Sequence, residues 1–124
     1  MAKSFRDLKV WNLSMDLTVL VYALTTDFPK HEIYGLSSQM RRAAVSIASN
    51  LAEGSARASR RDFKQFVVIA HGSNCELQTQ LMLASRLRYA TQAKIIEAEE
   101  LSHEIGRMLT GLSRFLSTKP QSSH

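Results

Sequence analysis

The sequence predicts an all-α protein that folds as an up-down-up-down four-helix bundle. Only two prolines and five glycines interrupt its 124 residues, and apolar residues recur at intervals of three and four rather than two. The connections between the second, third and fourth predicted helices are short, so these neighbours should run antiparallel. We expect one bundle domain over residues 1–117 and a flexible, polar C-terminal tail over residues 118–124.

The first two predicted helices span residues 4–28 and 37–54. Ser4 and Asp7 resemble a capping box at the start of the first, and Pro29 ends it. Ser37 is the expected cap of the second, and Gly54 suits the left-handed conformation that often follows a helix end.

The last two predicted helices span residues 59–89 and 91–117. Ser59 and Asp62 repeat the capping box, and no breaker follows before Tyr89, so the third helix should be roughly 46 Å long. Thr91 is the expected cap of the fourth helix.

Composition places the chain among proteins with a packed core. Apolar residues make up 44% of it, but no apolar run approaches the ~20 residues of a spanning helix, and residues 1–25 lack the layout of a signal peptide. The single cysteine, Cys75, cannot form an internal disulfide. We therefore expect a cytoplasmic protein with no membrane partner.

The first predicted helix carries two apolar stripes, one of which includes Trp11, Met15 and Val19. The third helix has a similar excess, for which a broadly buried central helix is the simpler explanation. Two stripes on the first helix favour contact with another subunit, so we expect a homo-oligomer. The expected interface residues are Leu13, Leu17, Leu20, Leu24, Ile69 and Leu83.

The net charge is +5, and its excess gathers at one end of the predicted bundle. Folding the helices back on one another brings nine basic and three acidic residues to this end, a net charge of +6, whereas four basic and five acidic residues lie at the other. The nine are Lys3, Arg6, Lys9, Arg57, Arg60, Arg61, Lys64, Arg114 and Lys119.

A cluster of this kind can bind nucleic-acid phosphates with release of counterions. Phe5 and Phe63 are the nearby aromatic residues and are assigned to packing, so we expect binding without base reading. Ordinary solubilising arginines, or a surface for an acidic protein partner, would explain the same pattern. The residues predicted to bind RNA or DNA are Arg6, Lys9, Arg57, Arg60, Arg61 and Lys64.

The short motifs of NTPases, zinc proteases and serine hydrolases are missing, so we expect no catalytic residues, no cofactor, no metal and no enzyme activity. His71 and Cys75 have a zinc-ligand spacing but need two further ligands, which favours a structural pair. Glu100 and His103 supply the Glu-x-x-His spacing of di-iron bundles only once.

Polar residues of the third helix are expected to have structural roles. Ser73 and Asn74 should satisfy hydrogen bonds across the bundle. Glu76 should lie level with the start of the second helix, where it can accept from free amides or pair with Arg41.

The segment "FPKHEIYGLSSQMRRAAVSIASNLAEG" (residues 28–54) resembles the signature of a four-helix bundle family first noticed as products of intervening sequences in bacterial large-subunit ribosomal RNA genes. "FRDLKVW" and "HGSNCEL" extend the resemblance over residues 5 to about 90. Leu51 and Asn74 depart from the family pattern. Among the matching residues, those assigned structural roles are Arg41, Arg42, Asn50, Glu53, Gly54 and Glu76.

The resemblance implies a four-helix subunit that assembles into a ring of five, in a small bacterial protein without known enzyme activity. The chain is also similar in architecture to accessory proteins of diversity-generating retroelements, which are basic pentameric barrels that bind nucleic acid and a reverse transcriptase. We therefore expect a non-enzymatic ring that binds RNA or DNA through a basic rim. A protein-protein adaptor ring with no nucleic-acid role is the alternative.

Overall fold

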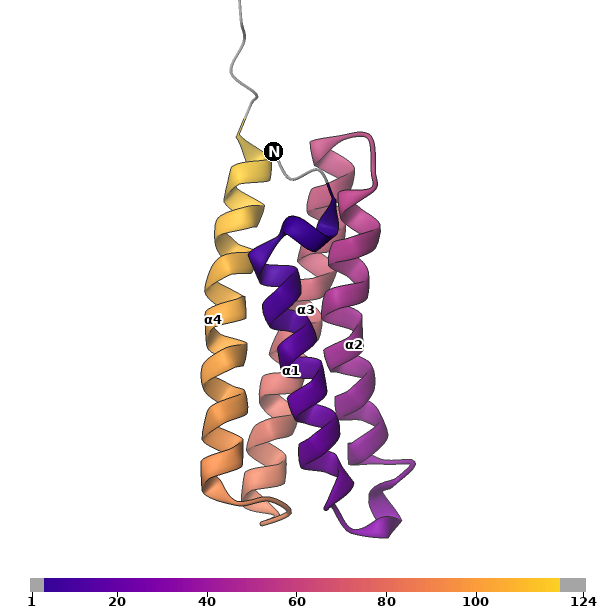
Figure 1. Cartoon of the computed structure of the whole chain (residues 1–124), viewed down its shortest axis with the longest axis vertical. Coiled ribbons are helices and arrows are strands. Elements are labelled where there is room, and N and C mark those ends of the chain that lie inside the picture. The colour runs from indigo at the N-terminus through magenta and orange to yellow at the C-terminus, as the bar shows by residue number, and fades with distance from the viewer. Residues whose placement is uncertain (1–3, 119–124) are drawn as a thin grey trace, which may run out of the picture.

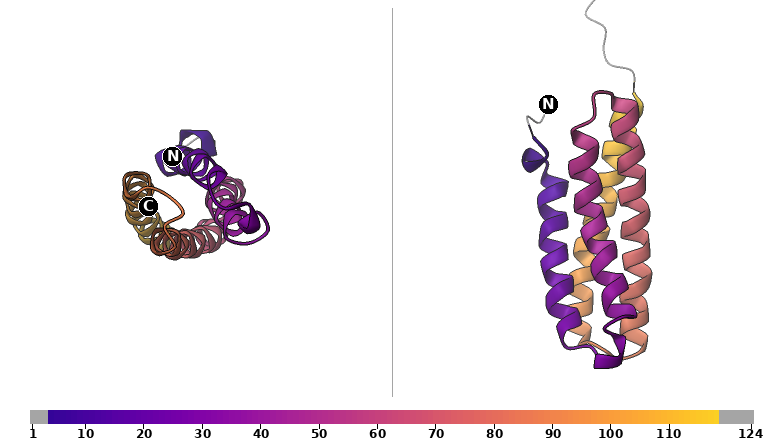
Figure 2. Two further views of the ribbon diagram at one scale, coloured as in Figure 1. Left: turned by 90° about the horizontal axis from the view of Figure 1, so that it is seen from below. Right: turned by 90° about the vertical axis from the view of Figure 1, so that its right-hand side faces the viewer.

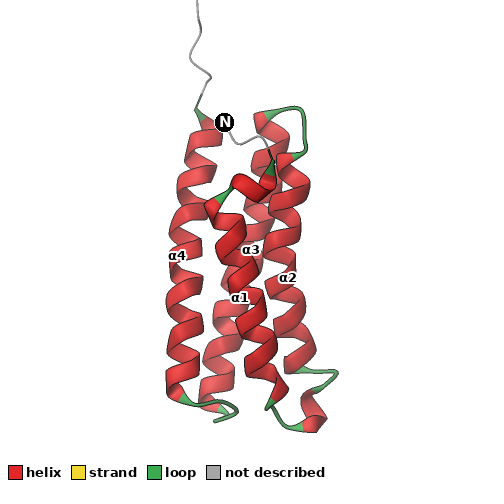
Figure 3. Cartoon of the chain, in the orientation of Figure 1, coloured by secondary structure: helices red, strands yellow, loops and turns green. Residues whose placement is uncertain are grey.

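The computed structural model describes residues 4–118, which form helices and loops with no strand in that range (Figures 1 and 3). The prediction of an all-α, four-helix chain is confirmed. Residues 1–3 and 119–124, the latter being most of the predicted tail, lie outside the described residues. The elements are η1 (Phe5–Asp7), α1 (Lys9–Thr26), η2 (Lys30–Glu32), α2 (Leu36–Ser55), α3 (Arg60–Arg86) and α4 (Gln92–Ser117).

The four helices run up and down and follow one another around the bundle in chain order (Figure 2). Each of α1 and α3 packs on both α2 and α4, and the backbones of the diagonal pairs do not approach closely. The start of α1, the α2–α3 turn and the end of α4 therefore share one end of the bundle, while the α1–α2 and α3–α4 connections share the other (Figure 1).

The first helix begins later than predicted. The Ser4 hydroxyl accepts from the Arg6 amide at 3.1 Å, but the turn that it caps is η1 rather than α1. Leu8 then has extended backbone, and α1 starts at Lys9. The Asn12 side-chain amide donates to the carbonyls of Arg6 and Leu8, both at 3.0 Å, and so satisfies the carbonyl groups at the break.

The cap predicted for α2 is wrong. Ser37 is buried inside the helix, and the Leu36 amide instead donates to Glu32 Oε1 at 3.1 Å. A Cβ on Gly35 would lie 2.5 Å from that oxygen. Glycine therefore leaves room for a carboxylate that reaches forward from η2 to cap α2.

The role predicted for Gly54 is also wrong. Gly54 is a buried member of α2, and no glycine in residues 4–118 has a positive φ. A Cβ here would lie 2.6 Å from Phe66 Cβ and 2.9 Å from Phe63 Cδ1. The glycine is needed because α2 and α3 approach closely, not because the chain turns left-handed.

The starts of α3 and α4 are as predicted. Ser59 accepts from the Asp62 amide at 3.0 Å, and Thr91 accepts from the Lys94 amide at 3.4 Å. The end of α3 comes earlier than predicted, at Arg86, since Arg88 adopts φ 58° in the left-handed region. Arginine thus takes the position that glycine usually occupies beyond a helix end.

The core is a single apolar cluster that runs the length of the bundle. One polar pair lies within it: Asn74 Nδ2 donates to the Ser102 carbonyl at 2.9 Å, and Ser102 Oγ donates to Asn74 Oδ1 at 2.8 Å. Both residues are fully buried, so this pair holds α3 and α4 in register, as expected for Asn74. The largest fully buried apolar side chains are Leu17, Met40, Ile47, Leu51, Leu77, Leu81, Ile95, Ile105 and Leu109.

Within residues 4–118, none of the helices has a stretch both long and apolar enough to cross a bilayer.

Candidate nucleic-acid interface

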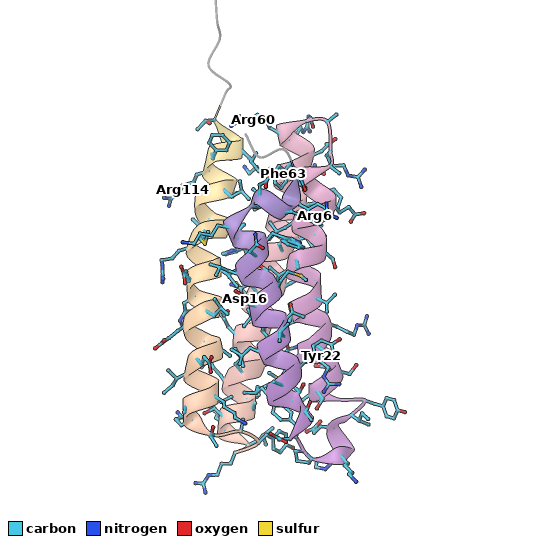
Figure 4. All side chains as sticks on the ribbon, in the orientation of Figure 1. Arg6, Asp16, Tyr22, Arg60, Phe63 and Arg114 are labelled. Atoms are coloured by element: carbon cyan, nitrogen blue, oxygen red, sulfur yellow. The ribbon has the colours of Figure 1, made fainter. Side chains whose placement is uncertain are left out.

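Seven of the nine predicted basic residues fall within the described range and gather at one end of the bundle. Figure 4 labels three of them, Arg6, Arg60 and Arg114, at this end. Three acidic residues share it, so the net charge of its described part is +4. Lys3 and Lys119 lie outside the described residues. We call this group the basic end: Arg6, Lys9, Arg57, Arg60, Arg61, Lys64 and Arg114.

Arg60 holds the end of α4 in place. Its guanidinium lies 4.4 Å above the Phe115 ring, donates to the Phe115 carbonyl, and donates to Thr118 Oγ1 at 3.3 Å. The last carbonyls of a helix lack intrahelical partners and carry partial negative charge, so a cation there is favourable. Arg60 therefore has a structural role in addition to its charge.

Arg57 is also engaged within the chain. It pairs with Glu53 at 3.6 Å, one turn earlier, and its guanidinium lies 4.8 Å above the Phe66 ring. Arg6 lies 4.6 Å above the Phe5 ring. Because a guanidinium stacked on a ring keeps its outer edge free, Arg57 and Arg6 can still donate to an anion.

The other cations of the basic end form no ion pair within residues 4–118. None of Lys9, Arg61, Lys64 and Arg114 lies within 4.0 Å of a carboxylate oxygen of residues 4–118, and neither does Arg6. Arg61 and Lys64 lie one turn apart at the start of α3, where the helix dipole adds positive potential. The result is a surface with several unpaired cations and a net positive charge.

A cavity of about 510 Å³ lies at the centre of this end, and we call it the end cavity. It is bounded by the residue before η1, the α2–α3 turn and the last turns of α4, which confirms that the chain brings these three segments together. The lining residues are Ser4, Leu8, Ser55, Arg57, Ala58, Ser59, Arg60, Phe63, Leu112, Phe115 and Leu116.

The sequence prediction missed the aromatic partners of these arginines. Phe66 and Phe115 were not assigned to the site, although each lies beneath a guanidinium and Phe115 is 56% exposed. The signal was weak, because Arg60 and Phe115 are 55 residues apart and meet only when α3 and α4 pack.

The opposite end balances its charges. Glu32 caps α2 and also accepts from the Tyr89 hydroxyl at 2.8 Å. The bond from the Leu36 amide, followed by that from Tyr89, lowers the pKa of Glu32 below its usual value of 4.5, and the same contact raises the pKa of Tyr89. Lys94 pairs with Asp27 at 3.6 Å. No comparable excess of cations forms here.

The residues predicted to be structural follow the α1–α2–α3 side of the bundle. Arg41 Nε donates to Thr25 Oγ1 at 2.8 Å and its guanidinium lies 4.8 Å above the Tyr22 ring. Asn50 Nδ2 donates to the Ser46 carbonyl at 2.8 Å. Arg41 thus joins α2 to α1, whereas Asn50 bonds to an earlier turn of its own helix.

Glu76 does not have the predicted partners. It neither caps α2 nor pairs with Arg41, but accepts weakly from Gln80 Nε2 at 3.4 Å along its own helix. Arg42 and Glu76 instead line a groove of about 740 Å³ between α2 and α3. The groove also contains a hydrogen bond between the Ser46 and Ser73 hydroxyls, 2.8 Å apart, and the Gln80 side chain.

The predicted subunit-contact residues divide into two groups. Leu17 and Leu24 are 0% and 2% exposed, so they belong to the core of the single chain and are not available to a second subunit. Leu13 and Leu20 are partly buried against the same core. Ile69 and Leu83 are about half exposed on α3.

The exposed stripe of α1 is not the one that was predicted to contact another subunit. It comprises Met15, Val19 and Tyr22, of which Val19 is 69% exposed, and it continues onto α2 at the exposed Val45. Which stripe faces the core depends on where α2 and α4 pack. The helix period alone does not decide that.

Within residues 4–118, no three His, Cys, Asp or Glu side chains lie close enough together to hold a metal ion. Cys75 is exposed, whereas His71 is half buried beside a small cavity between α3 and α4. The two side chains thus have different surroundings, and Cys75 is not part of a buried pair.

The chain was compared with curated proteins and with solved structures. No curated protein matches the chain. One similar solved structure is a protein of unknown function of the S23 ribosomal protein family from Bacteroides thetaiotaomicron. It is 25% identical with a TM-score of 0.76, and the alignment covers 88% of this chain and 99% of that one.

A family described as 23S rRNA-intervening sequence protein matches residues 6–111. The match includes α1, α2 and α3 and most of α4, and so extends beyond residue 90, where the motif resemblance ended. The chain therefore belongs to the 23S rRNA-intervening sequence protein family.

Proposed function

We propose that the protein is a non-enzymatic, oligomeric binding protein whose basic end holds the phosphates of RNA or DNA without reading base sequence. The observation that carries the proposal is that five cations of this end, among them Arg61 and Lys64, have no carboxylate partner in residues 4–118. Uncompensated cations attract a polyanion and release its counterions, whereas paired surface cations contribute little.

Self-assembly would strengthen this interaction. The apolar stripe of Met15, Val19 and Tyr22 on α1, and the exposed Ile69 and Leu83 on α3, supply two different surfaces for neighbouring subunits. Two different surfaces are what a closed ring requires, and the family resemblance suggests a ring of five. In a ring of like-oriented subunits every basic end lies on the same rim, so the phosphate contacts multiply.

Assembly is tested by sedimentation velocity on wild type and the Val19→Glu variant. Val19 is 69% exposed, so the variant should keep the helical content of the wild type while its oligomers dissociate. A wild-type monomer at micromolar concentration would contradict the assembly.

The family description suggests a setting in ribosomal RNA biology, and we propose a cytoplasmic location for it. A long polyanion of this kind offers many phosphates, which suits a surface that tolerates any sequence. We propose RNA as the first ligand to test.

The binding test compares two charge-reversal variants that change net charge equally. Arg61→Glu/Lys64→Glu removes two unpaired cations of the basic end, and acidic residues are tolerated in the first turns of a helix. Lys30→Glu/Arg88→Glu makes the same change among exposed residues at the opposite end. Fluorescence anisotropy with a labelled RNA measures the affinity of each.

We expect the first variant to bind more weakly than wild type. Its plot of log affinity against log salt concentration should be shallower by about 2, because each lost phosphate contact reduces the steepness by about 1. The second variant should bind like the wild type. Equal weakening of both variants would mean that only total charge matters, and would contradict the proposed site.

A protein-protein adaptor is the second candidate, and the groove between α2 and α3 favours it. Gln80 is 5% exposed, lines this groove, and its Oε1 has no donor among the described residues. A buried acceptor without a donor is costly, and a donor from a partner could satisfy it. If the protein co-purifies with a stoichiometric protein and without nucleic acid, this candidate replaces the first.

A further inference from the structure

The end cavity has the make-up of a ligand site rather than of a packing defect. Its volume of about 510 Å³ falls in the range of roughly 300–1,000 Å³ that is usual for ligand pockets. Leu116 is buried, and Leu8, Phe63 and Leu112 are half buried, so they form an apolar floor. The remaining lining is mostly serine hydroxyls and two arginines, a small polar set of the kind that orients a ligand.

Arg60 and Phe115, which line the end cavity, form a stacking surface. The Phe115 ring is 56% exposed, and the Arg60 guanidinium lies 4.4 Å above it while donating to the Phe115 carbonyl. Arg60 Nε is buried and has no acceptor in residues 4–118. Phenyl rings and guanidinium planes are the surfaces on which proteins stack unpaired bases.

Anion-binding groups surround this surface. Arg57 and Arg60 line the cavity, and Arg61 and Lys64 lie in the first two turns of α3. The amides at the start of α3 add partial positive charge, as at any helix N-terminus. A ligand that fits must therefore combine a flat, largely apolar group with neighbouring phosphates.

Duplex nucleic acid does not present that combination, because its bases are paired and stacked inside while only phosphates and groove edges face outward. A single strand presents both an exposed base and the neighbouring phosphates. We propose that the end cavity takes one unpaired base of a single-stranded nucleic acid whose flanking phosphates lie on the basic end. This inference rests on the proposed function and adds to it a preference for single strands.

The first test separates the contribution of the base to binding affinity from that of the phosphates. Fluorescence anisotropy compares oligothymidylate with an abasic oligomer of the same length and backbone charge, and with a duplex of that length. We expect oligothymidylate to bind about 5- to 100-fold more tightly than the abasic strand, as stacking of one base provides. Equal affinity of the two strands, or tighter binding of the duplex, would overturn the proposal.

The second test removes the aromatic ring and keeps the apolar side chain. Phe115→Leu should bring the affinity for oligothymidylate down to that for the abasic strand while leaving abasic binding unchanged. The matched control is Tyr34→Leu, which alters a 92% exposed aromatic residue at the other end and should leave both affinities unchanged. If Phe115→Leu weakens both strands equally, Phe115 only supports Arg60 and the base site is refuted.

The outcomes separate the two proposals. If all three ligands bind with the same strong salt dependence and with no preference for a base, the phosphate surface stands and the base site fails. If none of them binds, the proposed function fails and the base site fails with it.

Discussion

The two ends of the bundle each use a charged side chain to cap a helix, but the charges have opposite sign. At the basic end Arg60 donates to the carbonyl of Phe115 at the C-terminus of α4, and at the other end Glu32 accepts from the Leu36 amide at the N-terminus of α2. Both choices follow the helix dipole. The two ends differ in their other charges. Acidic and basic residues balance one another near Glu32, whereas several cations near Arg60 have no partner within the described residues.

The comparison separates two roles that a basic residue can have. Arg60 and Arg57 stack on rings or pair within the chain, and their loss would affect the fold. Arg61 and Lys64 have no such contacts among the described residues. A bound polyanion would give them negatively charged partners.

The largest effect on stability is expected from Gly54→Ala, at the basic end. The added methyl group would lie 2.6 Å from Phe66 Cβ, and this overpacking should cost about 1–3 kcal/mol of unfolding free energy. Urea denaturation followed by circular dichroism measures it.

The control is Gly111→Ala in α4, where nothing lies within 4 Å of an added Cβ. That change should stabilise the protein by about 0.5–1 kcal/mol because alanine is the better helix former. A neutral Gly54→Ala variant would contradict the close approach of α2 and α3.

A smaller effect is expected from Arg60→Ala. Loss of the charged hydrogen bond to α4 and of the contact with the Phe115 ring should cost about 1–2 kcal/mol. The neighbouring Arg61→Ala should stay within about 0.5 kcal/mol of wild type, since Arg61 is exposed. If the two variants are equally stable, Arg60 does not have the structural role assigned to it.

The smallest effect is a pH dependence at the other end. Because the pKa of Glu32 is lowered, its bonds to Leu36 and Tyr89 contribute stability above pH 4.5, and this contribution is lost as the pH falls through the folded-state pKa. The raised pKa of Tyr89 means that the same contact persists below pH 10 and is lost as the pH rises through the folded-state value.

Thermal melts of wild type and Glu32→Gln at neutral and acidic pH test this window. We expect the variant to be less stable than wild type at neutral pH and the two to converge as the pH falls through the folded-state pKa of Glu32. Glu100→Gln, which alters an exposed carboxylate of α4, should melt like wild type across the series. A gap between Glu32→Gln and wild type that stays constant with pH would rule out a role for the carboxylate charge.

Much of the fold could be predicted because its signals are local. The caps at Ser59 and Thr91 act over three residues, and they mark the starts of α3 and α4 correctly. The cap of α2 could not be predicted in the same way, because Glu32 reaches its partner across a turn that the sequence does not specify.

The candidate site was predictable in charge but not in detail. In an antiparallel bundle, the number of residues between each basic residue and the nearest turn is enough to place the basic residues at one end. The Phe115 contact with Arg60 and the inward face of α1, where Leu17 lies rather than Val19, depend on how helices distant in sequence pack together. Those contacts decide which cations belong to the fold and which stripe of α1 is exposed.

The central claim is that nucleic acid binds at the basic end of the bundle. Hydrogen exchange with mass spectrometry, performed on the full chain with and without a saturating single-stranded oligonucleotide, tests it most directly. We predict slower exchange in peptides that cover residues 55–66 and 112–118, and no change in those that cover residues 27–35 and 86–94. Protection confined to residues 27–35 and 86–94, or no protection anywhere, would contradict the account.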